Sequence, residues 1–429
     1  KGIYNQNKES NIMSLFQNIL SSVMKGTRRL NRLGSKSFGT LHKDINKATE
    51  SVMSTTGEVS TQVYAEHLLN LIEDLDDKRL STFLKNLLSK YDIDTKILLK
   101  NAKNYSSEKN EKNYQEISNS SEPRWIELFR RLNSTPNGTY RLVKMRERIR
   151  SLNNEDFKIL DYGLLRLFKY WFNPSFLVLE RIDWETPANI LEKIIQYEAV
   201  HEINSWKDLR ARLAPKDRQC FAFFHPLIPN DPLIFVEVAL CSGVPKSIQK
   251  IIKIDRQEID IEEANTAIFY SISNCHNGLL GISFGNFLIK EVAKNLKREL
   301  PELNQFLTLS PLPGFMKWME EYAPITFERC SEKNCSDDEL MKKAIKYLTE
   351  SDRKDGMPND PVGRFHIGNG ASLERVNLGA DLSEKGLLQS YGVMANYLYD
   401  LDVVEENHEI FYKNKVVPVS SEIKSKKKK

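Results

Sequence analysis

The stretch FLTLSPLPGF, residues 306–315, is an apolar run that ends at Ser310 and is interrupted at once by Pro311 and Pro313. Proline has no N–H to donate to a neighbouring strand, and Pro311 also restricts Ser310 to an extended conformation. We therefore predict a strand that stops at Ser310 and separates there from its neighbour, which opens a cleft beside a hydroxyl. The alternative is a serine that only satisfies a turn amide. No GxSxG surrounds Ser310, so serine-hydrolase chemistry is not supported.

The segments on both sides of this stretch predict an α+β second half. Short runs of β-branched and aromatic residues, separated by Pro, Asn, Asp and Gly, have the composition of strands. An amphipathic helix is expected over residues 285–300, and Ser336 and Glu339 have the spacing of a capping box at the start of another helix. The predicted strands before residue 306 are CFAFFHP (220–226), LIFVEVAL (233–240) and TAIFYSIS (266–273).

The first half of the chain predicts helices. Apolar residues return every three or four positions from about residue 58 to residue 200, and glycine is scarce. We expect a helix break at 135–138 and a helix end near 173–174. The polar stretch 101–122 has the composition of a loop or surface hairpin.

Charge is unevenly distributed along the chain, although the net charge is only +4. Residues 13–43 contain no Asp or Glu but several Lys, Arg and Ser, which is typical of a mitochondrial transit peptide. A basic arm that binds nucleic acid or lipid is the alternative. The remainder is slightly acidic and does not favour nucleic-acid binding. No apolar window is long enough for a membrane span. The ending IKSKKKK (423–429) predicts a solvated tail without the Ser-Lys-Leu signal of peroxisomal proteins.

The five cysteines indicate a reducing compartment, because their number is odd and no CxxC spacing or matching histidine set predicts a zinc site. We expect no metal. Cys330 and Cys335 are interpreted as plain loop thiols; the other three are Cys220, Cys241 and Cys275.

The glycine-rich stretch NGLLGISFGNFLIKEV (277–292) lies between a predicted strand and a predicted helix. Glycine lets the backbone approach a ligand, and the first amides of a helix attract phosphates, so this turn is a candidate diphosphate site. A purely structural turn is an equal alternative, and the GxGxxG spacing of dinucleotide-binding folds is missing.

Among seven histidines, His366 is the candidate for proton transfer, because it lies in a strand-like run flanked by Gly363 and Gly368. A lone histidine is more often structural, and we read the other six that way.

Seven segments together resemble the malonyl-CoA decarboxylase family, and the resemblance covers most of the chain after the basic segment. They are RRLNSTPNG (130–138), YWFNPSFLVLERIDWETPANILEKIIQYEAVH (170–201), AIFYSIS (267–273), GLLGISFGNFLIKEV (278–292), LSPLPGFMKW (309–318), PVGRFHIGNGA (361–371) and GVMANYLY (392–399).

The resemblance implies an all-α N-terminal domain that builds a homo-oligomer, with a tetramer expected, followed by a catalytic domain of the GNAT acyltransferase type with a splayed mixed sheet. The expected domains are a transit peptide with upstream residues at 1–43, helices at 44–205, the catalytic domain at 206–420 and a Lys-rich tail at 421–429. The mitochondrial matrix is the expected location, with the cytoplasm as the alternative.

The resemblance also implies the site residues. It assigns catalysis to Ser310 and His366, with Tyr399 matching a further tyrosine of the pocket. Ser283 stands where related decarboxylases have an acidic residue. The turn expected to bind malonyl-CoA consists of Leu280, Gly281, Ile282, Ser283, Phe284, Gly285 and Asn286.

The implied reaction is loss of CO2 from malonyl-CoA to give acetyl-CoA, as part of fatty-acid metabolism. The thioester takes up the electron pair, so no separate cofactor is expected. Two other functions remain open: a GNAT-type acyltransferase that needs an amine acceptor, and a CoA-binding scaffold without catalysis.

Overall fold

The computed structural model describes residues 42–332 and 334–428, and the predicted transit peptide lies almost wholly outside them. The chain forms two compact units. We call the first, residues 42–173, 226–229 and 276–282, the helical unit. We call the second, residues 174–225, 230–275, 283–332 and 334–428, the sheet unit. Among the described residues, no helix has the length and apolarity needed to cross a membrane.

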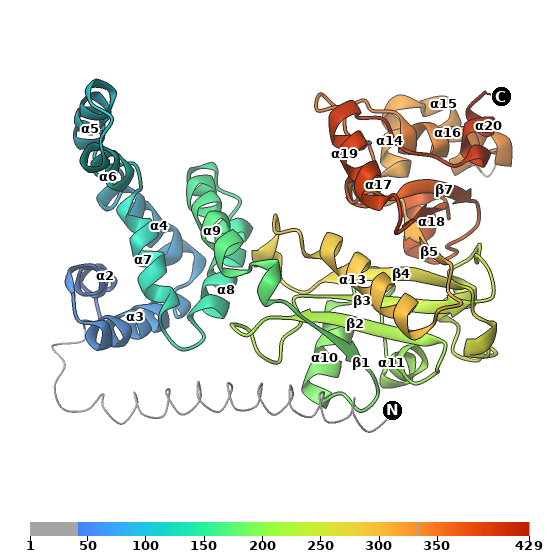
Figure 1. Ribbon diagram of the computed structural model, residues 1–429, viewed down its shortest axis with the longest axis horizontal. Coiled ribbons are helices and arrows are strands. Elements are labelled where there is room, and N and C mark those ends of the chain that lie inside the picture. The colour runs from blue at the N-terminus through green and yellow to red at the C-terminus, as the bar shows by residue number, and fades with distance from the viewer. Residues whose placement is uncertain (1–41, 333, 429) are drawn as a thin grey trace. The chain divides into compact units, whose positions relative to one another are not determined.

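The helical unit contains helices joined by short turns (Figure 1). Aspartates cap several of them; for example, the side chain of Asp76 accepts a hydrogen bond from the Arg79 N–H at the start of α4. The predicted break and the predicted end near residue 173 are confirmed. The helices are α2 (Ile45–Ser54), α3 (Glu58–Glu73), α4 (Asp77–Lys90), α5 (Thr95–Ser107), α6 (Glu111–Ser120), α7 (Arg124–Asn133), α8 (Gly138–Ser151), η1 (Glu155–Phe157), α9 (Lys158–Trp171) and the short η4 (Asn277–Leu279).

The polar stretch 101–122 was predicted as a loop or surface hairpin, and the prediction of a loop is wrong. Helices α5 and α6 form a helical hairpin in which no residue is fully buried. Asp94 and Asn110 cap the two helices with their side chains. Local capping therefore supports two helices here, although neither of them has a fully buried residue.

The sheet unit is built around an eight-stranded mixed sheet with the order β1-β2-β3-β4-β5-β8-β6, and β7 pairs with β8. Only β4 and β5 are parallel, and α13 (Phe284–Glu299) connects them. All other strand pairs are antiparallel. The strands are β1 (Val178–Ile182), β2 (Arg218–Phe224), β3 (Ile234–Cys241), β4 (Thr266–Asn274), β5 (Gln305–Thr308), β6 (Ser310–Pro311), β7 (Ser372–Asn377) and β8 (Met394–Leu398).

Helices cover both faces of the first four strands (Figure 1). On one face, α10 (Ala188–Tyr197) and α11 (Trp206–Leu213) bury an apolar cluster against β1, β2 and β3. On the other face, α13 contacts β2 and β3, and the ring of Phe287 stacks on Phe223. The other helices of this unit are η2 (Pro174–Phe176), α12 (Gln249–Ile252), η3 (Ile261–Glu263), α14 (Phe315–Tyr322), α15 (Pro324–Ser331), α16 (Asp337–Thr349), α17 (Pro361–Gly368), α18 (Glu384–Ser390), α19 (Val404–Asn414) and α20 (Ser421–Lys428).

The sheet splays where the sequence predicts it. The β4–β5 register ends at Phe269 and Thr308, although β4 continues to Asn274. Beyond that point, Ser310 and Pro311 pair only with β8. The predicted fold class, an all-α region followed by an α/β region with a splayed mixed sheet, is confirmed.

Three predictions at the edges of the sheet unit need correction. Residues 178–182 were expected to be helical, but they form β1, which pairs with β2 along its whole length. Residues 174–205 therefore group with the sheet, not with the helices as expected. The C-terminal tail begins with α20, which buries Ile423 and contacts α16 and β7, so only part of it is solvated.

The interpretation of Cys330 and Cys335 as loop thiols is also wrong. Cys330 is buried in the last turn of α15, and a disulfide joins it to Cys335 just before α16. The other three cysteines are free.

Candidate active site

Ser310 begins β6, two residues after Thr308, the last residue of β5. Its side chain is buried, with 4% of the residue exposed. Pro311 follows it in the strand and pairs with Met394 of β8. The Ser310 hydroxyl donates a hydrogen bond to the Thr308 hydroxyl at 2.9 Å and lies 3.0 Å from Nε2 of His366.

His366 lies in α17, so the prediction of a strand-like run is wrong. Asp360 caps this helix, because its carboxylate accepts from the Gly363 N–H at 2.5 Å, and Pro361 occupies the first helical position. Gly370 ends the segment with a φ of +89°. An aspartate followed by proline, and a glycine just beyond the last turn, are helix signals that are present in the sequence.

The structure brings together three residues that are far apart in the sequence. Ser310 and His366 are separated by 56 residues, and the other ring nitrogen of His366, Nδ1, lies 2.9 Å from the hydroxyl of Tyr399. Tyr399 follows β8 directly, and its N–H donates to the carbonyl of Phe306. Strand, helix and strand end thus each supply one member of a hydrogen-bonded chain.

All three side chains are shielded from water, and this sets their protonation. Burial lowers the pKa of His366 to about 3, so its imidazole is neutral near pH 7. Burial also raises the pKa of the Tyr399 phenol well above its usual value, so the phenol keeps its proton. The site therefore contains a neutral imidazole between two neutral hydroxyl groups.

Tyr397 is a member of the site that sequence reasoning missed. Its ring stacks on the imidazole of His366 with 4.7 Å between centroids, and it is almost completely buried. Tyr397 and Tyr399 are two residues apart, and side chains at that spacing on an extended chain share a face. The repeated tyrosine in ANYLY was the signal that could have identified both.

The glycines of the predicted phosphate-binding turn are required at their positions for different structural reasons. Gly281 has a φ of +94°, a conformation that L side chains rarely adopt. A Cβ on Gly278 would lie 2.1 Å from the carbonyl oxygen of Val143, so this glycine is required by packing within the helical unit. A Cβ on Gly285 would lie 2.5 Å from the ring of Phe365, the residue next to His366. Two of the three glycines are thus explained by close protein packing.

The predicted turn is divided between the units along the chain. Leu280, Gly281 and Ile282 belong to the helical unit, whereas Ser283 to Asn286 belong to the sheet unit. Leu280 is 42% exposed. Helix α13 begins at Phe284, and the Ser283 side chain makes no capping hydrogen bond there. The start of a helix attracts phosphate groups through its backbone amides and dipole, which makes the start of α13 a candidate site for a diphosphate.

One residue of the helical unit holds the first part of this turn. Arg146 is completely buried, and its Nη1 donates to the carbonyls of Gly278 and Leu280 at 2.7 and 2.9 Å. Its Nε donates to Asp161 at 2.8 Å. Sequence reasoning missed Arg146, because nothing in its local pattern distinguishes it from the other arginines of α8.

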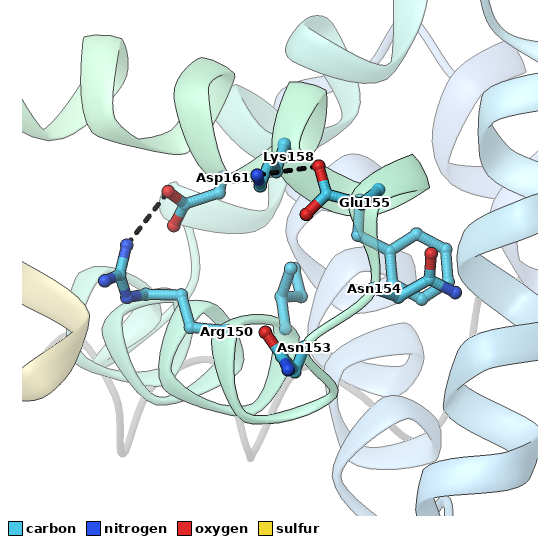
Figure 2. Close-up of a pocket in the computed structure, with 8 residues that line it drawn as sticks. Arg150, Asn153, Asn154, Glu155, Lys158 and Asp161 are labelled. Carbon is cyan, nitrogen blue, oxygen red and sulfur yellow. Dashed lines mark hydrogen bonds and ion pairs between the residues drawn. The ribbon is translucent and has the colours of Figure 1, made fainter.

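A separate polar cavity of about 180 Å³ lies in the helical unit, between the end of α8 and the start of α9 (Figure 2). Its charged groups are already paired: Arg150 donates to Asp161, and Lys158 pairs with Glu155. The cavity contains no histidine, serine or cysteine. It offers no group for nucleophilic or imidazole acid–base chemistry, so the Ser310 cluster is the better candidate.

Comparison with known proteins gives a consistent result over both units. The family model for the malonyl-CoA decarboxylase N-terminal domain matches residues 91–172, and the C-terminal domain model matches residues 175–340 and 323–429. The chain is 34% identical over 350 residues to the mitochondrial malonyl-CoA decarboxylase of Anser anser anser, covering 71% of this chain and 69% of that protein. Its identity to the Rattus norvegicus enzyme is 32%, with 71% of each chain covered.

Two crystal structures of malonyl-CoA decarboxylases resemble about nine tenths of the chain. The protein from Agrobacterium vitis has a TM-score of 0.85 and 42% identity, with 90% of this chain and 100% of that chain covered. The protein from Rhodopseudomonas palustris has a TM-score of 0.84 and 41% identity, with 89% and 98% covered. By sequence and by structure, this chain belongs to the malonyl-CoA decarboxylase family.

Proposed function

We propose that the chain converts malonyl-CoA to acetyl-CoA and CO2 at the cluster formed by Ser310, His366 and Tyr399. The observation that carries this proposal is the 3.0 Å contact between Ser310 Oγ and His366 Nε2, buried beside the splayed end of β5, in a member of this family.

Decarboxylation breaks the bond between the carboxylate carbon and the methylene carbon. The electron pair moves into the thioester as an enolate, and CO2 leaves. Donors that face the thioester oxygen lower this barrier, and one such donor is typically worth about 3–4 kcal/mol. We assign that role to backbone N–H groups at the splayed strands. CoA is part of the substrate, so the proposal needs no further cofactor.

We assign the proton that completes acetyl-CoA to His366. In the free protein the imidazole is neutral, because burial lowers its pKa to about 3. The malonyl carboxylate brings a negative charge into the site, and a nearby anion raises the pKa of an imidazole. Substrate binding thus favours protonation of His366, and the ring then donates from Nε2, the nitrogen that faces Ser310. Such an acid typically contributes about 10²- to 10⁴-fold in rate.

Ser310 and Tyr399 receive supporting roles. The Ser310 hydroxyl lies against Nε2 and is assigned to hold the substrate carboxylate or the imidazole. The Tyr399 hydroxyl lies against Nδ1, which fixes the orientation of the ring. We assign the CoA diphosphate to the turn from Leu280 to Asn286, at the amides that begin α13.

We further propose that the protein is a mitochondrial homo-oligomer. Its curated relatives from goose and rat are mitochondrial enzymes. On α9, Ile159, Tyr162 and Tyr170 share one helix face and are 49%, 62% and 75% exposed. A face of this kind is suited to contact another copy of the chain. Light scattering on the purified protein tests the assembly, with a tetramer as the expected state and a monomer contradicting the proposal.

The activity is tested by incubating the purified chain with malonyl-CoA and no acceptor. A decarboxylase releases CO2 and acetyl-CoA in equal amounts, whereas an acyltransferase leaves malonyl-CoA intact until an amine is added. The matched control is His67→Asn, which changes a half-buried histidine of α3 in the helical unit. Equal, slow breakdown of malonyl-CoA with and without the protein would contradict the proposal.

A further inference from the structure

At one position, side chains take part in the contact between β5 and β8. Leu307 pairs with Leu398 and Ser310 pairs with Ala395, so Thr308 lies opposite Tyr397 in the register. At this position the backbone N–H of Tyr397 donates to the Thr308 hydroxyl at 3.1 Å. The carbonyl of Thr308 accepts from the side-chain amide of Asn396 at 2.7 Å. Side chains thus join the strands just before the sheet opens at Ser310.

The Thr308 hydroxyl also accepts the hydrogen bond of Ser310 at 2.9 Å. A hydroxyl oxygen has two lone pairs, and here the Tyr397 N–H and the Ser310 O–H occupy both. Because the Ser310 proton points to Thr308, the Ser310 oxygen must accept from His366. Nε2 of His366 then carries the ring proton, and Nδ1 accepts from the Tyr399 hydroxyl. One hydroxyl in β5 therefore sets the direction of the whole chain of hydrogen bonds.

A second pair of side chains holds Thr308 itself. Asn396 is completely buried, and its Oδ1 accepts from the side-chain amide of Asn377 in β7 at 2.7 Å. Thr308 is also completely buried, and Asn377 is 5% exposed. Buried amides are costly unless they are hydrogen-bonded, and an apolar pair would fill the same space without that cost. The polar pair thus has a specific task here: Asn396 of β8 anchors the Thr308 backbone, and Asn377 of β7 holds Asn396 in place.

We propose that Thr308 is a positioning residue, anchored by Asn396 and Asn377, which orients the Ser310 hydroxyl and selects the tautomer of His366 with the proton on Nε2. The proposal rests on the proposed function for its effect on the reaction. Its effect on the tautomer does not depend on the reaction and can be measured in the free protein.

The first test is the tautomer of His366 in the full-length wild-type chain, read from the ¹⁵N chemical shifts of the imidazole nitrogens. His366→Asn identifies the signals by their loss. We expect the proton on Nε2. A proton on Nδ1 in the wild type would overturn the proposal, whether or not any variant folds.

The second test compares Thr308→Val with Thr308→Ser. Valine keeps the branched shape but removes the hydroxyl, whereas serine keeps the hydroxyl. Loss of orientation in a reacting group costs up to about 100-fold in rate. We expect Thr308→Val to lower kcat by about 10- to 100-fold with KM changed less than about threefold, and Thr308→Ser to restore most of kcat. A Thr308→Val enzyme with wild-type kcat would overturn the proposal.

A double-mutant cycle separates positioning from general damage. If Thr308 acts through Ser310, then Thr308→Val should cost little further activity in a Ser310→Ala background. If the losses of kcat from the two single substitutions instead multiply in the double variant, Thr308 does not act through Ser310. If the wild type shows the Nε2 tautomer but no decarboxylation, the proposed function fails and the positioning by Thr308 stands. If the wild type decarboxylates and Thr308→Val matches it, only the positioning fails.

Discussion

Replacing His366 with asparagine should make the folded protein less sensitive to acid. Burial lowers the pKa of His366 from 6.5 to about 3 in the folded state, so below pH 6.5 the unfolded chain binds a proton that the native protein does not. The contribution of this group to the free energy of unfolding is therefore constant above about pH 6.5, and it is lost as the pH falls toward 3. Between pH 7 and pH 5 the loss is about 2 kcal/mol, from 1.36 kcal/mol per unit of pKa.

The assay is urea unfolding at pH 7 and pH 5 for the wild type and for His366→Asn. Asp360, whose pKa burial raises to about 7, acts in the opposite direction, since its native form holds a proton that the unfolded form loses above pH 3.8. It is present in both proteins, so it cancels when their pH dependences are compared. We expect the variant to lose about 2 kcal/mol less than the wild type, and His67→Asn to behave like the wild type. Identical pH dependence in all three proteins would refute a buried, neutral His366.

Three further predictions concern residues around this cluster. Gly281→Val should weaken CoA binding at least tenfold by calorimetry, because valine is strained at this positive φ. The control Gly243→Val, with open space around the glycine, should bind CoA as the wild type does. Equal CoA affinities for the two variants would argue against CoA binding at this turn. Arg146→Leu should lower the free energy of unfolding by about 3–5 kcal/mol, because the substitution leaves Asp161 and two turn carbonyls without their buried partner. A loss below about 1 kcal/mol in a urea unfolding experiment would show that the turn does not depend on Arg146. Tyr399→Phe should lower kcat about tenfold while CoA affinity is retained, since only the contact with the imidazole is removed; an unchanged kcat in stopped assays would remove this tyrosine from the mechanism.

Much of the sheet unit follows from local sequence patterns. The strands β2, β3 and β4 and the helix α13 were predicted from the spacing of their apolar residues and from the Pro, Gly, Asn and Asp residues that flank them. The end of the strand at Ser310 follows from Pro311, because the effect of proline on its neighbours is local. The strand β1 was missed for the opposite reason: it is short, and its pairing with β2 is a tertiary contact that no local pattern encodes.

The site was only partly accessible from the sequence. Ser310, His366 and Tyr399 were assigned through a family resemblance, and the helix that carries His366 was mistaken for a strand despite the Asp360 cap. Thr308 was not singled out, because its role depends on lying opposite Tyr397 in another strand. Register between distant strands is set by the whole fold, so cross-strand partners of this kind cannot be read from one segment.

The most direct test of the account is a pair of measurements on one variant, His366→Asn: the rate of CO2 release from malonyl-CoA without an acceptor, and the affinity for CoA by calorimetry. The account predicts a kcat lower by about two to four orders of magnitude and a nearly unchanged CoA affinity, because the ring supplies a proton and does not hold the nucleotide. A variant that releases CO2 at the wild-type rate would contradict it.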